Sequence, residues 1–283
     1  MLVAALFVSG VVMAFFGYVP AAEQAHKSVA DITASSLSGI RSAHSLVAEV
    51  FLVMIFLHMT RIAMTRSWHG DRKKNWHSGI LLLCVASLFF YTGITLKWDQ
   101  QGYEAFDHIV MLAGLAGLKG LFAGSGPTKM FVIHAVVLPL LLAGILGGHM
   151  MLVKINGISP LAPGDDNAAG PQTTFLHHIR HVAAYGLILL GVVHLVAAYY
   201  TPPLLGEPFA GVEWTKPAWP FLFLYPLETW ALVVVPLIAI AVLAIIPFLA
   251  NPLKKWDASQ ALFFILVMLW AALTFFGAVK HFA

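Results

Sequence analysis

Seven apolar stretches of about 20 residues each divide this chain, and they constrain its fold more than any other feature. At about 1.5 Å per residue, a helix of that length crosses the ~30 Å hydrocarbon core of a bilayer. Only 10% of the residues are charged, against roughly 25% in soluble domains. The sequence therefore predicts an all-α integral membrane protein with seven transmembrane helices. The predicted spans are residues 2–20, 42–64, 78–96, 129–153, 178–200, 227–249 and 259–280.

Several classes of protein and site are excluded by composition. The single cysteine, Cys84, rules out a disulfide framework and any cysteine-rich metal or iron–sulfur site. A net charge of +3, scattered along the chain, is too small for a nucleic-acid partner. The first 20 residues have no basic leader and no small-residue cleavage site, so we expect a first span there and no signal peptide.

Positive charge is concentrated in the connections on one predicted side of the membrane. These are the stretch RSWHGDRKKNW at 66–76 and the loops that carry Lys154, Arg180 and Lys254. The positive-inside rule puts them in the cytoplasm. We therefore expect a prokaryotic cytoplasmic membrane protein with its N-terminus inside and its C-terminus on the outer side.

Two long connections face the predicted outer side. Residues 97–127 contain AFDHIVMLAGLAGLKGLF, a pattern that favours a short amphipathic helix at the interface. Residues 201–226 are rich in Pro, Gly and Trp, which is typical either of an ordered loop that covers a site or docks a partner, or of an interfacial aromatic belt. On the other side, the polar stretch 161–173 is predicted to link a four-helix domain at 1–160 to a three-helix domain at 174–283.

Four histidines lie in pairs within two of the predicted spans. His44 and His58 share one span, and His134 and His149 share another. Spacings of 14 and 15 residues bring each pair back to roughly the same helix face, about 21 Å apart along the axis. Both helices are expected to run from outside to inside, so His44 matches His134 at the outer depth and His58 matches His149 at the inner depth.

The paired depths favour metal ligation. A single buried histidine is often only hydrogen-bonded to a neighbouring helix, and zinc prefers three or four protein ligands at one point. Two imidazoles per level, from facing helices, instead suit the two axial positions of a haem iron. The pattern predicts two b-type haems that carry electrons across the bilayer.

Further residues near these levels suit a haem pocket. Gly79 and Gly93, 14 residues apart on one face, would let a porphyrin lie against the backbone, although small-residue packing gives the same pattern. Arg41, Arg61 and Lys129 lie three to five residues from a predicted ligand and would pair with propionates, or else anchor the helix ends.

The whole pattern resembles cytochrome b of the bc-type quinol oxidoreductases. The resemblance rests on the two histidine pairs, on the glycine pair, and on text such as RSAHSL, FLHMTR and YTGITLKWDQ. The back half is similar to the three-helix subunit four of the photosynthetic-type complex, through YYTPPLLGEP and WPFLFLYPLETW. This resemblance implies a low-potential haem at His44 and His134, a higher-potential haem at His58 and His149, and a homodimer.

Some family positions differ. The outer quinol-oxidation motif Pro-Glu-Trp-Tyr reads PAWP at 217–220, so that Ala218 replaces the proton-accepting Glu. Lys97 stands where the family has a Pro, and Gly10 alone represents the glycine pair of the first helix. The family's attachment cysteine for a further haem is missing, and Cys84 is predicted to be core.

A quinone site is expected at the inner level. TTFLHHIRHVAAYG brings His177, His178, Arg180 and His181 to the cytoplasmic start of a span, where proton-exchanging groups suit quinone chemistry. A positive-inside anchor would look the same. His194 lies deeper on that helix, and it would serve a third haem only with a partner that the sequence does not identify.

The sequence therefore predicts a di-haem electron-transfer subunit, without catalytic residues of its own, between a quinone pool and an outer redox partner. That partner would be a Rieske-type protein, a cytochrome c, or a dehydrogenase or reductase. One alternative is a conventional quinol–cytochrome c oxidoreductase core in which Glu213 or Glu228 replaces the motif Glu. A second is a haem-free transporter or scaffold.

Overall fold

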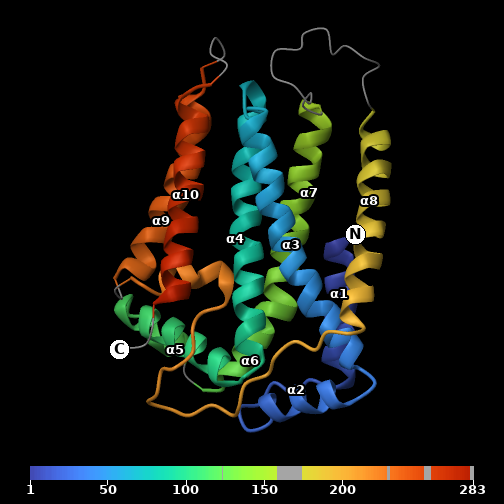
Figure 1. Cartoon of the computed structure of the whole chain (residues 1–283), viewed down its shortest axis with the longest axis vertical. Helices are drawn as coiled ribbons and strands as arrows, with labels where there is room; N and C mark the ends of the chain where they lie inside the picture. The colour runs from blue at the N-terminus through green and yellow to red at the C-terminus, as the bar shows by residue number, and fades with distance from the viewer. Residues whose placement is uncertain (123, 158–173, 228–229, 252–255, 281–283) are drawn as a thin grey trace. The chain divides into compact units, whose positions relative to one another are not determined.

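The structure is a computed structural model that describes residues 1–122, 124–157, 174–227, 230–251 and 256–280. Helices account for its regular structure, and these residues contain no strand. Its helices are α1 (Leu2–Phe16), α2 (Ala25–Ala34), α3 (Ser38–Met64), η1 (Gly70–Arg72), α4 (Lys73–Leu96), α5 (Gln100–Leu115), η2 (Lys119–Phe122), α6 (Gly126–Val132), η3 (Ile133–Val137), α7 (Leu138–Asn156), α8 (Phe175–Ala197), η4 (Trp219–Leu224), α9 (Ala231–Ile245), η5 (Ile246–Leu249) and α10 (Ala258–Val279) (Figure 1).

The predicted all-α membrane fold is confirmed. Among the described residues, 6 helical segments are long and apolar enough to cross a bilayer. The prediction of seven included residues 2–20, where the structure has the apolar helix α1 of 15 residues. At about 1.5 Å per residue, α1 is roughly 22 Å long and falls short of the ~30 Å core. It ends at Gly17, where a Cβ would collide with Ile32 of α2.

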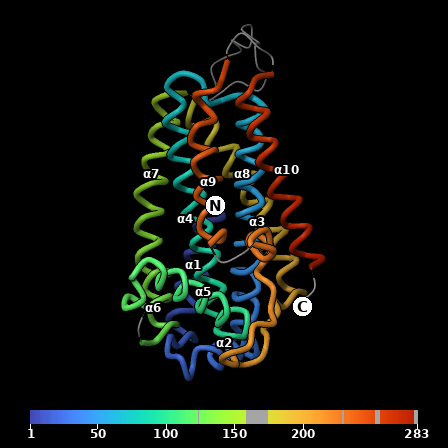
Figure 2. Tube along the Cα trace, turned by 90° about the vertical axis from the view of Figure 1, so that its left-hand side faces the viewer, coloured from blue at the N-terminus to red at the C-terminus, as the bar shows by residue number. Residues whose placement is uncertain are grey.

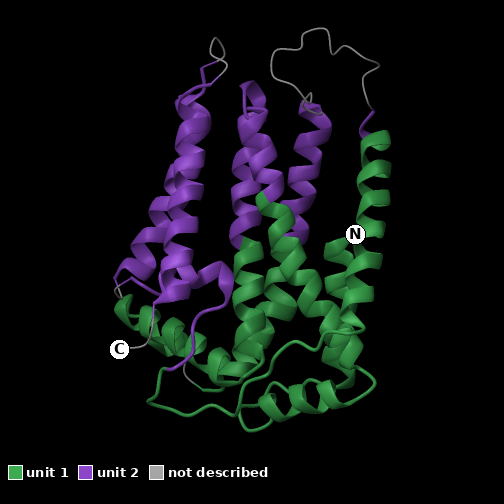
Figure 3. Ribbon diagram, in the orientation of Figure 1, with its two compact units in different colours: residues 1–56, 85–141, 176–213 green, residues 57–84, 142–175, 214–283 purple. Residues whose placement is uncertain are grey.

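The described chain forms two compact units, which we treat separately (Figure 3). Unit 1 comprises Met1–Phe56, Val85–Leu141 and Leu176–Glu213, and unit 2 comprises Leu57–Cys84, Leu142–Phe175 and Trp214–Ala283. The predicted linker at 161–173 lies outside the described residues.

In unit 1, α2 and α5 lie across one end of the long helices (Figures 1 and 2). Helix α5 confirms the amphipathic helix expected within 97–127, whereas α2 was not predicted. A core cluster at this end consists of Ala25, Trp98, Phe106 and Met130. The Trp98 and Phe106 rings meet edge-on with centroids 5.5 Å apart, so aromatic packing holds α5 against its neighbours.

The start of α5 also holds residues 202–213 in place. Asp99, fully buried, caps the helix by accepting from Gly102 N–H at 2.9 Å, and its other oxygen accepts from Leu205 N–H at 3.1 Å. Lys97, the residue that departs from the family's Pro, lies 3.0 Å from the same carboxylate. Gln100 accepts from Phe209 N–H at 2.7 Å. These hydrogen bonds order the backbone of the connection, and its role as a docking loop or an aromatic belt stays a prediction.

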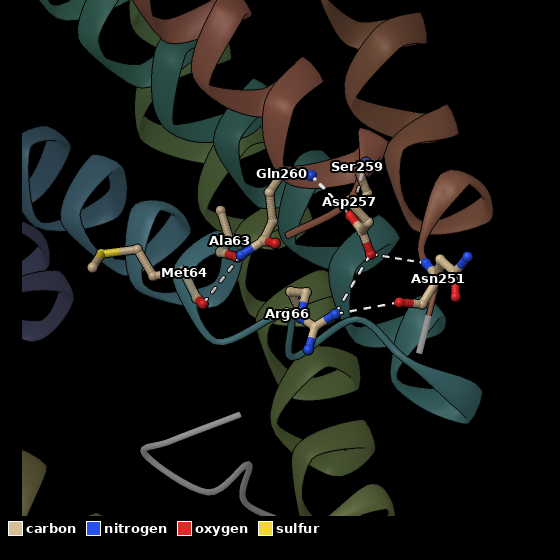
Figure 4. A network of polar contacts seen from close by, with 7 residues as sticks. All are labelled: Ala63, Met64, Arg66, Asn251, Asp257, Ser259 and Gln260. Atoms are coloured by element: carbon tan, nitrogen blue, oxygen red, sulfur yellow. Dashed lines mark hydrogen bonds and ion pairs between the residues drawn. The ribbon is translucent and has the colours of Figure 1, made fainter. Parts of the chain in front are cut away.

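In unit 2, a polar network joins the end of α3 to the start of α10 (Figure 4). Asp257 caps α10 by accepting from Ser259 N–H at 2.9 Å, and it also accepts from Asn251 N–H at 2.8 Å. The Arg66 guanidinium lies 3.7 Å from the same carboxylate. Gln260 donates to the carbonyls of Ala63 at 3.2 Å and Met64 at 3.3 Å, which satisfies backbone acceptors at the end of α3.

This network predicts a pH-dependent contribution to stability. Burial acts to raise the pKa of Asp257, but hydrogen bonds from the Ser259 hydroxyl and from three backbone N–H groups outweigh it, so the pKa lies below its ordinary value. The contribution is therefore present above the unfolded-state pKa of about 4 and is lost as the pH falls through the folded-state value. We expect Asp257→Ala to lower the free energy of unfolding by about 1–2 kcal/mol at pH 7.

Thermal unfolding of the detergent-solubilised protein at pH 7 and near pH 3 checks this. The matched control is Asp31→Ala, which removes a carboxylate from an exposed pair with Lys27 and should leave unfolding unchanged. A deficit of Asp257→Ala that stays constant down to low pH would contradict the assignment.

Candidate functional site

Two of the predicted ligands meet in unit 1. The imidazole rings of His44 on α3 and His134 on η3 have centroids 6.4 Å apart and planes at 56°. With metal–nitrogen bonds of about 2 Å, two rings on opposite sides of one metal have centroids roughly 6 Å apart. The separation therefore fits one ion held between the two imidazoles.

His134 lies in an irregular turn of its helix. Residues Ile133–Val137 form a π-helical turn between α6 and α7, a deviation that often marks functional sites. Phe89 packs edge-on against the imidazole, with ring centroids 5.3 Å apart. The turn and the aromatic contact together set where the ring points.

A hydroxyl group fixes the protonation of His44. Ser9 Oγ on α1 lies 2.9 Å from His44 Nδ1, and the same hydroxyl donates to the Ala5 carbonyl at 2.7 Å. Because the hydroxyl proton is used on the backbone, its oxygen accepts from an Nδ1–H group. The Nε2 lone pair of His44 is then left for a metal.

The same arrangement occurs at His134 and His149. Thr92 Oγ1 lies 2.8 Å from His134 Nδ1 and donates to the Leu88 carbonyl at 2.7 Å. In unit 2, Ser78 Oγ lies 2.8 Å from His149 Nδ1 and donates to a backbone carbonyl at 2.9 Å. Three predicted ligands therefore have their Nδ1–H bound by a hydroxyl from another helix.

A glycine follows each of these hydroxyl residues and lies against the same imidazole. A Cβ on Gly10 would come within 3.3 Å of His44 Cε1, and one on Gly93 within 3.3 Å of His134 Cε1. A Cβ on Gly79 would come within 3.7 Å of His149 Cε1. At Gly10 and Gly93 a side chain would therefore crowd the imidazole, whereas at Gly79 it would make an ordinary contact. The porphyrin role of Gly79 and Gly93 stays a prediction.

Three of these residues were missed at the sequence level. Ser9, Ser78 and Thr92 look like ordinary small residues of apolar helices when taken singly. The signal that could have found them is the repeated dipeptide of a hydroxyl residue followed by glycine, at the glycine positions already singled out.

The fourth predicted ligand, His58, lies on the part of α3 that belongs to unit 2, and it is exposed. His149, on α7, belongs to the same unit. Arg61 is half-buried one turn further along the same helix. The structure thus brings together His44 and His134 directly, and it places His58 and His149 in one unit.

Two of the predicted propionate partners bind backbone carbonyls. Buried Arg41 donates to Pro202 O at 2.9 Å and Pro203 O at 3.4 Å, and Lys129 donates to Leu121 O at 2.7 Å. Both cations thereby hold loops of unit 1 in place.

The predicted quinone residues occupy the first turns of α8 in unit 1. His177, Arg180 and His181 are exposed, and the two imidazole rings have centroids 4.2 Å apart. His181 Nδ1–H donates to the His177 carbonyl at 2.9 Å. His194, further along α8, donates in the same way to Leu190 O at 2.7 Å.

The altered outer motif, PAWP at 217–220, lies at the start of η4 in unit 2. Ala218 precedes η4, which packs closely on α10 because Gly277 leaves no side chain between it and the Leu222 carbonyl. In unit 1, Glu213 Oε1 lies 3.4 Å from His108 Nε2. Glu228, the other candidate for the missing Glu, lies outside the described residues.

The chain is similar in sequence to known proteins. The sequence model of the family described as "Cytochrome b/b6/petB" matches residues 1–157. Cytochrome b6 of Heliobacterium mobile is 32% identical over 165 residues, which cover 54% of this chain and 77% of that protein. Cytochrome b6 of Euglena gracilis is also 32% identical, over 164 residues that cover 53% of this chain and 76% of that protein.

A solved structure shares the fold along almost the whole chain. A chain of "Hyperthermophilic respiratory Complex III" matches with a TM-score of 0.76 and 22% identity, covering 99% of this chain and 82% of that chain. The four predicted haem ligands and the three dipeptides of a hydroxyl residue and glycine all fall within the family match at 1–157. The chain belongs to the cytochrome b family.

Proposed function

We propose that the protein holds two b-type haems, one between His44 and His134 and one between His58 and His149, and carries electrons across the membrane. Membership of the cytochrome b family already implies haem b and membrane electron transfer. The observation that carries the proposal is the 6.4 Å separation of the His44 and His134 rings, together with the hydroxyl bound to each Nδ1.

The chain's own residues suit axial ligation. A haem with both axial positions filled by imidazole has no open position, so it supplies one-electron transfer rather than oxygen binding. Ser9, Thr92 and Ser78 keep the proton on Nδ1, which orients each ring and makes Nε2 a better donor. Gly10 and Gly93 leave out side chains that would crowd the His44 and His134 rings.

The redox partner is proposed to dock on the predicted outer loops. Arg41 donates to the backbone of residues 202–213, and Asp99 and Gln100 accept from it, so that this backbone is fixed while Phe209 remains 68% exposed. A rigid backbone that presents apolar side chains suits docking, because little freedom is lost on binding. The partner would be a Rieske-type protein, a cytochrome c, or a dehydrogenase or reductase subunit.

At the other end of the electron-transfer path, quinone is proposed to exchange electrons with the protein. His177, Arg180 and His181 offer exposed groups that exchange protons or carry charge, as quinone chemistry requires. We also keep as proposals the cytoplasmic N-terminus in a prokaryotic membrane, a homodimer, and the fusion of a front domain at 1–160 with a back domain at 174–283.

A second candidate is a conventional quinol–cytochrome c oxidoreductase core. The contact of Glu213 with His108 favours it, since a carboxylate beside an imidazole on the predicted outer side could take the proton that Ala218 cannot. Oxidant-induced haem reduction with the quinone-reducing site blocked, lost in Glu213→Gln, would support this candidate over the first.

Substitution of the ligands tests the haem assignment. We expect purified wild type to contain two b-type haems per chain, and His44→Ala and His149→Ala to lose one each, with different haem signals affected. Haem content and reduced-minus-oxidised spectra measure this, with His194→Ala as a control that keeps both. A haem-free transporter would show no b-type absorbance, and unchanged signals in both variants would refute the ligand set.

Removal of one hydroxyl tests its role without removing a ligand. Thr92→Val keeps the shape of the side chain but leaves the His134 Nδ1–H without its acceptor, so the iron should be less electron-rich. We expect one haem midpoint potential to rise by about 40 mV, the equivalent of a hydrogen bond of about 1 kcal/mol. The other potential should not move.

The matched control is Ser87→Ala, which removes another hydroxyl of helix α4. Among the described contacts, this hydroxyl touches neither His44 nor His134. Redox titration of both variants checks the prediction. Equal potentials in Thr92→Val and wild type would show that the hydroxyl has no electronic effect on the site.

A further inference from the structure

A polar pocket in unit 2 is not used by the function proposed above. Its volume is about 340 Å³, and it is lined by His69, Asp71, Arg72, Ile155 and Asn156. Its walls come from the connection between α3 and α4 and from the end of α7. It therefore joins two segments that lie more than 80 residues apart in the sequence.

The walls of this pocket are tied together. Gly70 has a φ of +59°, which lets the chain turn sharply after His69 into η1. The side chain of Asn156 donates to Asp71 O at 3.3 Å and to Asn75 Oδ1 at 2.6 Å. These hydrogen bonds join the end of α7 to the residues around η1, and so they hold the two walls of the pocket together.

The polar atoms of the lining call for an anionic ligand. His69 Nε2 is buried and has no hydrogen-bond partner in the described part of the chain. A buried polar atom of this kind is unfavourable until a ligand or water satisfies it. Arg72 adds a permanent positive charge and a planar set of donors that suits phosphate or carboxylate oxygens.

The charges around the pocket support the same conclusion. Burial lowers the pKa of His69, and the nearby positive charges of Arg66 and Lys73 lower it further, against the opposing effect of Asp257. Cations that disfavour a further positive charge on His69 would favour a bound negative charge. Asp71 is the single acidic residue of the lining.

We propose that this pocket binds a phosphate group, carried either by the headgroup of a membrane phospholipid or by free phosphate. Arg72 would bind two of its oxygens, and His69 would donate to a third. The volume exceeds that of a bare phosphate, and Ile155, which is 65% exposed, gives the pocket an apolar edge of the kind an acyl chain would contact. The inference does not depend on haem or on its ligands.

Binding is tested on the delipidated holoprotein in detergent. The unfolding midpoint is followed by tryptophan fluorescence while inorganic phosphate or phosphatidylglycerol micelles are titrated, with diacylglycerol of the same acyl chains in detergent as the phosphate-free control. We expect Arg72→Gln to need at least about tenfold more ligand for the same stabilisation, and His69→Gln to be weakened as well. Lys74→Gln is the matched control, because Lys74 is an exposed cation in the adjoining first turn of α4 and lies outside the lining.

The outcomes separate the sources of the phosphate. Stabilisation by phosphatidylglycerol alone assigns a lipid headgroup, and stabilisation by inorganic phosphate assigns a free-phosphate site; both support the proposal if Arg72→Gln weakens them and Lys74→Gln does not. Equal weakening by the two variants would mean diffuse attraction and would overturn it. The proposal would also be overturned if neither ligand stabilised the protein. It would be overturned as well if Arg72→Gln changed the haem spectrum but left phosphate binding intact. Haem content, measured in the same samples, tests the proposed function separately.

Discussion

The hydrogen bond between an imidazole Nδ1–H and a hydroxyl on another helix is the interaction on which the functional site depends. An imidazole in an apolar helix is costly unless both of its nitrogens are used. At His44, His134 and His149 the hydroxyl uses one nitrogen and leaves the lone pair on the other for the axial ligation proposed above. The hydroxyl itself is satisfied by a carbonyl of its own helix, so the arrangement introduces no unpaired group.

The glycine beside each hydroxyl completes this arrangement. A hydroxyl can reach an imidazole on a facing helix only where the two helices approach closely, and the missing side chain at the next position permits that approach. In this dipeptide the hydroxyl accepts a hydrogen bond from the imidazole, and the glycine places no side chain against the ring. The occurrence of the dipeptide in both units shows that this arrangement is repeated along the helices.

Much of this could be predicted from the sequence because the signals are local. The spans, α5 and the paired spacing of the four histidines follow from hydropathy and from helical rotation. The length of α1 could not be predicted in the same way, because the apolar stretch continues past Phe16, where the helix ends beside the close approach of Gly17 to Ile32. Helix α2 was missed since its buried face, Ala25, Ser28, Val29 and Ile32, is too short and too polar to form a clear apolar period.

The sequence by itself determined that the protein crosses a membrane and that its histidines are spaced to meet in pairs, because both properties depend on the order of residues along single helices. Tertiary structure decided what each side chain does. Arg41 shows this, because the fold turns its guanidinium toward the carbonyls of Pro202 and Pro203, a contact that the sequence does not indicate. Ser9 carries no functional signal on its own, and it becomes part of the site because α1 packs where its hydroxyl reaches His44. Contacts between distant segments are set by packing, which no local pattern records.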